Sequence, residues 1–171
     1  VTTSGTCAVM GTASTMACIT ETLGMALPGT AAIPAIHADR LRAAEASGAQ
    51  AVHLAQIDRD KQLTPKKIIT PASVENALRI LLAVGGSTNA IIHLTAIAGR
   101  LGIPIPLQQL NNLSDETPVL IDLKPTGDHY MEDLFKAGGL GVVLRELKPL
   151  GNLDCLSGTG ETLNERLQSE P

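Results

Sequence analysis

The sequence of 171 residues has almost no aromatic side chains: one Tyr, one Phe and no Trp. Its apolar fraction, 44%, therefore consists mainly of small and aliphatic residues, which allow helices to pack closely. No apolar run approaches the roughly 20 residues that span a bilayer. The first residues also lack the basic and apolar segments of a signal peptide. We therefore expect a cytoplasmic protein with no membrane contact, of a length typical of one domain.

Basic clusters and cysteines are also scarce. The 13 Lys and Arg residues are outnumbered by 17 Asp and Glu residues, which disfavours a nucleic-acid partner, because phosphate binding needs clustered positive charge. The three cysteines, Cys7, Cys18 and Cys155, are too few for a disulfide framework and do not have zinc-site spacing. This pattern indicates a reducing compartment.

Apolar residues recur every three or four positions over 12–26, which predicts a helix. A second helix is expected over 39–56, with Arg40, Arg42 and Glu45 on its wetter faces. Thr70 and Pro71 are suited to cap and begin a third helix, which ends at Gly85-Gly86 and should be deeply buried. The remaining expected elements are a helix over 88–101 capped by Ser87, an exposed charged segment over 57–69, an extended segment over 103–106, a strand over 118–123, and short helices over 131–136, 140–147 and 161–167.

Cys7 is the first candidate for chemistry, because it lies in a loop of small residues directly before a helix. The unpaired N–H groups and partial positive charge of a helix start favour a thiolate, which attacks carbon or binds metal. The alternative is a small buried residue in a tight loop. A thiol-nucleophile enzyme would need a histidine within reach, and His37 is the nearest candidate in sequence.

The segment Gly85 to Asn89 places two glycines and a capping serine before a helix. The amides of Ser87, Thr88 and Asn89 could hold a phosphate or carboxylate, as in a non-catalytic anion-binding module. The alternative, which we favour, is a joint between two helices whose glycines supply backbone freedom. His93, on an apolar helix, is expected to be a core residue, and Cys18 is expected to serve packing.

Several motifs resemble one family in its order. They are GTCAVMGTASTM at 5–16, ETLGMALPG at 21–29, GGSTNA at 85–90, IHL at 92–94, AGRLGIP at 98–104, KPTG at 124–127 and AGG at 137–139. Together they resemble the central region of the dihydroxy-acid and sugar-acid (aldonate, phosphogluconate) dehydratases, over about residues 4–165. The resemblance implies a helix-rich α/β fold: the second half of a three-layer N-terminal domain, incomplete at both ends. It assigns residues 1–149 to that iron–sulfur and Mg²⁺ domain and 150–171 to a linker toward a C-terminal domain.

The resemblance also implies an activity, the dehydration of a 2,3-dihydroxy acid to a 2-keto acid by a homo-oligomeric hydro-lyase. Its cofactors would be a [2Fe–2S] cluster on three cysteines, of which Cys7 matches one, and Mg²⁺ bound by residues outside this chain. Because the serine base belongs to the C-terminal domain, no catalytic residue is expected here, and the isolated chain should be inactive. Five residues are expected near the small hydroxy-acid substrate: Thr12, Ser14, Ser87, Thr88 and Asn89.

Particular residues within these motifs indicate which substrate group of the family the chain resembles. The segments MGTASTM at 10–16 and AAIP at 31–34 are similar to the sugar-acid members. Members acting on dihydroxyisovalerate more often show a Tyr-Thr-Ala-Asn variant. The sequence therefore leans toward a sugar-acid substrate.

Overall fold

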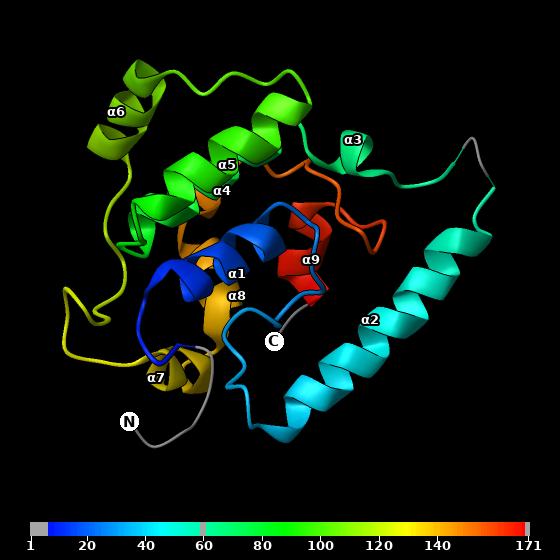
Figure 1. Cartoon of the computed structure of the whole chain (residues 1–171), viewed down its shortest axis with the longest axis horizontal. Coiled ribbons are helices and arrows are strands. Elements are labelled where there is room, and N and C mark those ends of the chain that lie inside the picture. Colours follow the sequence, from blue (N-terminus) through cyan, green and yellow to red (C-terminus); the bar gives the residue numbers. More distant parts are fainter. Residues whose placement is uncertain (1–6, 59–60, 170–171) are drawn as a thin grey trace.

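The computed structural model describes residues 7–58 and 61–169, which form helices joined by irregular segments (Figure 1). The helix-rich character expected from the sequence is confirmed. The elements are α1 (Thr12–Thr22), α2 (Ala38–Gln56), α3 (Pro65–Ile68), α4 (Pro71–Ala83), α5 (Asn89–Arg100), α6 (Leu107–Glu116), α7 (Met131–Lys136), α8 (Gly139–Glu146), the 3₁₀ turn η1 (Lys148–Leu150) and α9 (Leu163–Ser169).

Helix α4 is the centre of the fold and contacts α1, α5, α6 and α8. It begins as predicted: the Thr70 hydroxyl accepts a hydrogen bond from the Ser73 amide, and the Ser73 hydroxyl accepts one from the Thr70 amide. Pro71 occupies the first turn, where its missing N–H costs nothing. Apolar residues on several faces of α4 are buried, including Leu78 and Ile80, and each contributes about 1.5–3 kcal/mol through burial.

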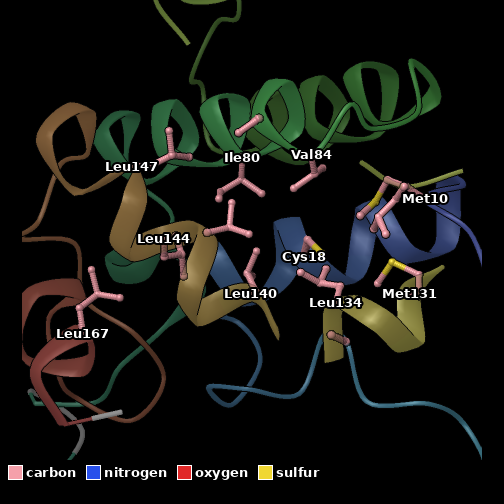
Figure 2. Close-up of a cluster of buried hydrophobic side chains, with 14 of the residues drawn as sticks. Met10, Cys18, Ile80, Val84, Met131, Leu134, Leu140, Leu144, Leu147 and Leu167 are labelled. Atoms are coloured by element: carbon pink, nitrogen blue, oxygen red, sulfur yellow. The ribbon is translucent and has the colours of Figure 1, made fainter. Parts of the chain in front are cut away.

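Two apolar clusters lie on different sides of α4. The first joins α1, α4, α7, α8 and α9, and Figure 2 shows its side chains meeting between these helices. The second joins α1, α4, α5 and α6. Cys18 of α1 belongs to the first cluster and is fully buried, which confirms its predicted packing role. Because α1 contributes to both clusters, its position is fixed from two sides.

Helix α2 has the predicted span but buries none of its residues. Leu41 and Val52 are 78% and 58% exposed, and Figure 1 shows α2 along the edge of the molecule. Among its bonds to the rest of the chain, the Gln50 side chain donates to the Gly158 carbonyl oxygen at 2.6 Å, and Arg40 donates to the Ile33 carbonyl oxygen. The helix is rich in Ala, so local propensity supports it where packing does not.

The strand predicted over 118–123 is not formed. Leu123 makes only an isolated bridge with His129, and Val119 and Leu120 are exposed. The β-branched pattern is present, but the described residues offer no neighbouring strand with which to form a ladder. The three-layer arrangement therefore stays a prediction.

Two helices, α6 and α3, were not predicted from the sequence. Helix α6 (Leu107–Glu116) was missed, although Leu107, Leu110 and Leu113 are spaced at helical intervals. Within the predicted exposed segment 57–69, α3 forms and Ile68 and Ile69 are buried; Arg59 and Asp60 lie outside the described residues.

The segment from 150 to 169 packs onto the rest of the chain. Leu163 and Leu167 of α9 join the first apolar cluster. Arg166 is 2% exposed, and its guanidinium lies 3.9 Å from the carboxylate of the fully buried Glu21 of α1. The same guanidinium donates to the Glu21 carbonyl oxygen at 3.4 Å. The placement of a domain boundary at 149/150 stays a prediction.

In residues 7–58 and 61–169, no helix combines the length and the apolar character needed to cross a membrane.

Candidate functional site

Cys7 lies, as predicted, in a tight loop that leads into α1. Its half-buried thiol donates a hydrogen bond to the Val9 carbonyl oxygen, with the sulfur 3.1 Å from that oxygen. Gly11 is the N-cap of α1, so the loop ends where the first unpaired amides of the helix begin. The neighbouring Gly5 and Thr6 of the same motif lie outside the described residues.

The pKa of the Cys7 thiol reflects opposing effects. Burial raises this pKa, but hydrogen bonds from the Val9 backbone, the Ser14 side chain and the Gly11 backbone lower it by more. The net result is a pKa below the ordinary value of a cysteine, the direction expected for a thiol ahead of a helix. Ser14, predicted to lie near the substrate, is therefore a neighbour of the sulfur.

The Cys7 loop is held by a second loop, residues 122–130. The Met10 amide donates to the Lys124 carbonyl oxygen at 2.7 Å, and the Met131 amide donates to the Ala8 carbonyl oxygen at 2.9 Å. The Lys124 ammonium donates to the Tyr130 hydroxyl at 2.8 Å and lies over the Tyr130 ring. These bonds fix the backbone that directly follows Cys7, at Ala8 and Met10, and the Lys124 side chain places a positive charge on the adjoining loop.

Three of the predicted substrate-proximal residues meet where α1 and α5 begin. The hydroxyl oxygens of Thr12 and Ser87 are 3.0 Å apart, within hydrogen-bond distance. The Asn89 side-chain amide donates to the Thr12 hydroxyl at 3.1 Å. Because residue 12 is separated from residues 87 and 89 by more than seventy positions, only the fold brings them together.

Close backbone packing makes this meeting possible. A Cβ on Gly86 would lie 2.7 Å from the Thr15 Cγ2 atom and 2.8 Å from a methyl group of Leu81. The glycine therefore lets the α4–α5 connection approach α1, and the Ser87 amide then donates to the Thr15 hydroxyl at 3.0 Å. Thr15 was not identified from the sequence as part of this site.

Thr88 differs from its neighbours. It is exposed and is the N-cap of α5, although its side chain makes no capping hydrogen bond. Ser87, predicted to be the cap, precedes it by one position, but its hydroxyl accepts a hydrogen bond from the Asn89 amide at 3.3 Å. Ser87 thus satisfies an amide of the first turn from just outside the helix.

This arrangement disfavours an anion-binding module at Ser87–Asn89. Of the three amides proposed to hold an anion, those of Ser87 and Asn89 already donate to the Thr15 and Ser87 hydroxyls. The segment therefore acts as the predicted helix joint.

The histidines do not support a thiol-nucleophile enzyme. His37 accepts a hydrogen bond from the Asp39 amide at 3.2 Å, and its ring contacts Phe135 edge-on, with ring centroids 5.0 Å apart. None of the groups that lower the pKa of Cys7 is a histidine. The prediction for His93 is wrong: it is exposed on α5, because the buried face of that helix contains Ala90, Leu94 and Ala98 instead.

The other two cysteines differ from Cys7. Burial, and then the negative charge of Glu21, raise the pKa of Cys18 to about 12. Cys155 is half-buried and accepts a hydrogen bond from the Asn76 side chain at 3.6 Å; burial raises its pKa. In the described part of the chain, no three His, Cys, Asp or Glu side chains gather to hold a metal ion.

Comparison with known proteins extends over nearly the whole chain. Residues 1–166 match the family described as dihydroxy-acid/6-phosphogluconate dehydratase, N-terminal. A dihydroxy-acid dehydratase of Caldanaerobacter subterraneus subsp. tengcongensis is 44% identical over 168 residues, which are 97% of this chain and 30% of that protein. One from Methanospirillum hungatei is 46% identical over 155 residues, 90% of this chain and 28% of that protein.

A third relative, a dihydroxy-acid dehydratase of Caldicellulosiruptor saccharolyticus, is 46% identical over 166 residues, which are 96% of this chain. The chain spans 29% of that protein, so it corresponds to under a third of the length of each of these curated relatives. The match covers the Cys7 loop, the α4–α5 joint and the loop that carries Lys124. The chain therefore belongs to the dihydroxy-acid/6-phosphogluconate dehydratase family and matches its N-terminal part.

Proposed function

We propose that this chain is part of a hydro-lyase that converts a 2,3-dihydroxy acid into a 2-keto acid. Family membership over residues 1–166 carries the proposal, and the Cys7 site supports it. The reaction removes the C3 hydroxyl and the C2 proton as water, and the resulting enol becomes the 2-keto acid. Hydroxide is a poor leaving group, so this chemistry needs an electrophile at the C3 oxygen.

We also propose that Cys7 donates one ligand to a [2Fe–2S] cluster. Such a cluster with an open iron position supplies the Lewis acid that the leaving hydroxyl requires. The thiol fits this role because its pKa is lowered and its side chain is only partly buried. The described residues supply one donor only, because Cys18 is buried in the core and Cys155 lies beside Asn76. The remaining cluster ligands, and those of Mg²⁺, would come from the longer protein.

The residues at the start of α1 and α5 would bind the substrate. Thr12 and Ser87 each offer a hydroxyl that can donate and accept, and Asn89 offers an amide. These groups suit a hydroxylated acid, whose oxygens would exchange hydrogen bonds with them. The Lys124 ammonium, which donates to the Tyr130 hydroxyl on the adjoining loop, would supply a positive charge for the carboxylate of such an acid.

The longer protein that contains this chain tests the proposal directly. Cys7→Ser should abolish 2-keto acid formation from both dihydroxyisovalerate and an aldonate, and should remove most of the visible absorbance and bound iron. Cys155→Ser is the matched control and should retain both. An active, iron-replete Cys7→Ser protein would contradict the ligand role, whereas an unmutated protein that dehydrates neither acid would contradict the hydro-lyase assignment. The 171-residue chain alone should show no turnover.

A further inference from the structure

One face of α2 is apolar and exposed, although surface helices usually present polar residues to solvent. Its members recur at helical spacings, and each of them is exposed: Leu41, Ala44, Gly48, Ala51, Val52 and Ala55. We call these six residues the α2 stripe. None of them is charged, and Glu45 lies at the edge of the stripe. The two largest members, Leu41 and Val52, are 78% and 58% exposed.

The opposite side of α2 faces the rest of the chain. Its partly buried residues include Arg40, which donates to the Ile33 carbonyl oxygen, and Gln50, which donates to the Gly158 carbonyl oxygen. The helix is therefore attached in part through polar groups, while its continuous apolar side points away. Figure 1 shows α2 at the edge of the molecule, where a second molecule can reach it.

Gly48 lies at the centre of the stripe, and packing within the chain does not explain it. It is in the interior of a 19-residue helix, where glycine is less favourable than alanine. A Cβ at this position would meet no described atom within 4 Å. A glycine does have a use where two helices cross, because the distance between their axes depends on the side chains at the contact.

The stripe is arranged symmetrically about Gly48. Ala44 and Val52 lie four positions to either side, and Leu41 and Ala55 lie seven positions to either side. If two copies of α2 cross antiparallel at Gly48, Val52 of each copy lies beside the small Ala44 of the other. Leu41 likewise lies beside Ala55. A two-fold interface requires such self-complementarity, because each contact occurs twice.

Charge does not oppose this pairing. With an antiparallel crossing at Gly48, the two Glu45 residues are six helical positions apart, about 9 Å along the axis. The N-terminus of each α2 also lies beside the C-terminus of the other, so the helix dipoles attract.

We propose that the α2 stripe is a dimer interface on which a second copy of this chain packs its own α2, antiparallel and crossing at Gly48. The proposal concerns assembly and does not depend on the dehydratase activity. It gives Gly48 a role between copies that it does not have within one.

Disulfide trapping tests the register of the two helices. All chains carry Cys7→Ser and Cys155→Ser, which leaves the buried Cys18 as the native thiol. Chains with Ala44→Cys and chains with Val52→Cys are mixed and mildly oxidised, and peptide mass spectrometry identifies the disulfides. The mixed 44–52 disulfide should dominate, because the two copies of position 44 would be about 12 Å apart, too far for a disulfide.

Ala46→Cys provides the matched control, because Ala46 is exposed but lies on the other side of α2, two positions before Gly48. Mixed with the Val52→Cys chain, it should form few disulfides. Statistical proportions of mixed and like disulfides between positions 44 and 52, or no disulfide at all, would overturn the proposal.

Sedimentation equilibrium measures the association of the unmodified chain. Val52→Glu should raise the dimer Kd by about tenfold or more, because it places an unpaired charge in the interface. Ala46→Glu adds the same charge off the stripe and should leave Kd unchanged. An unmutated chain that remains monomeric at millimolar concentration would overturn the proposal.

Gly48→Ala separates association from the stability of the helix. It should raise the unfolding temperature of the monomer, because alanine favours the helix, and yet weaken the dimer, because its methyl group separates the crossing helices. Gly99→Ala on α5 is the control: Gly99 is also exposed in a helix, and a Cβ there meets nothing within 4 Å. It should leave Kd unchanged. An unchanged Kd in Gly48→Ala would contradict a crossing at Gly48.

The longer protein distinguishes a second copy from cover by its own remaining residues. The 44–52 disulfide should form between its chains as well. If these introduced thiols are instead protected from iodoacetamide and form no disulfide between chains, another part of the same protein covers the stripe, and the proposal is wrong.

Discussion

The Cys7 thiol, in the loop that leads into α1, and the Cys18 thiol, within that helix, have opposite properties. Cys7 is half-buried, receives hydrogen bonds from backbone and Ser14, and has a lowered pKa. Cys18 is fully buried among apolar side chains, and its pKa is raised to about 12. One short helix and the loop before it thus present one thiol suited to ionisation and one that stays protonated. The difference arises from the surroundings, because the chemical group is the same.

The buried end of α1 also contains Glu21, whose role is to join parts of the fold. Its carboxylate accepts hydrogen bonds from the Gly29 and Ala31 amides at 2.9 and 2.7 Å, and it faces Arg166. These contacts join α1, the following loop and α9. The other end, at Thr12, gathers the polar groups of the candidate site, where the Thr12 hydroxyl meets Ser87 and Asn89.

The largest predicted effect comes from breaking the buried end. Glu21→Ala should lower the free energy of unfolding by about 3–5 kcal/mol, because it leaves the Arg166 charge buried without its carboxylate. Urea unfolding followed by circular dichroism measures the loss. Glu21→Gln keeps the volume and the acceptor oxygen, so it should cost less.

The same variants sharpen the comparison between the two ends. The groups that set the pKa of Cys7 are Val9, Ser14 and Gly11, so the alkylation rate of Cys7 in folded Glu21→Gln protein should equal that of the unmutated chain. A changed rate would contradict this independence and show that the two ends of α1 are energetically coupled.

A smaller effect is expected from the ionisation of Cys18. Its folded pKa lies above its unfolded value, so the contribution to stability is fully present below about pH 9 and is lost as the pH rises toward 12. By pH 10 the unmutated chain should lose about 1 kcal/mol relative to Cys18→Ala. Urea midpoints for both chains between pH 8 and pH 10.5 measure this difference. Parallel pH curves would show that Cys18 is not held in its protonated form by burial.

Local signals in the sequence predicted much of the helical frame. The Thr70-Pro71 start and the Gly85-Gly86 end define α4, and these residues act through their own backbone neighbours. The strand over 118–123 failed for the opposite reason, because a strand needs a partner that local pattern does not reveal. Helix α6 was missed although its leucines have helical spacing.

The candidate site was partly predictable. Cys7 and the Ser87–Asn89 joint were identified from motifs, but their partners were not. The bonds of Ser87 to Thr12 and Thr15, and the pair formed by Glu21 and Arg166, connect residues that are distant in sequence. The Ser87 bonds form because α1 packs against α4 and α5, and the Glu21–Arg166 pair forms because α9 lies against α1.

The most direct test of the account is the protection of Cys7 in the longer protein. Iodoacetamide labelling is compared, by peptide mass spectrometry, before and after reconstitution with iron and sulfide. If Cys7 is a cluster ligand, reconstitution should block its labelling almost completely while leaving that of Cys155 unchanged. Continued labelling of Cys7 at the unreconstituted rate, in protein that has taken up iron, would contradict the account.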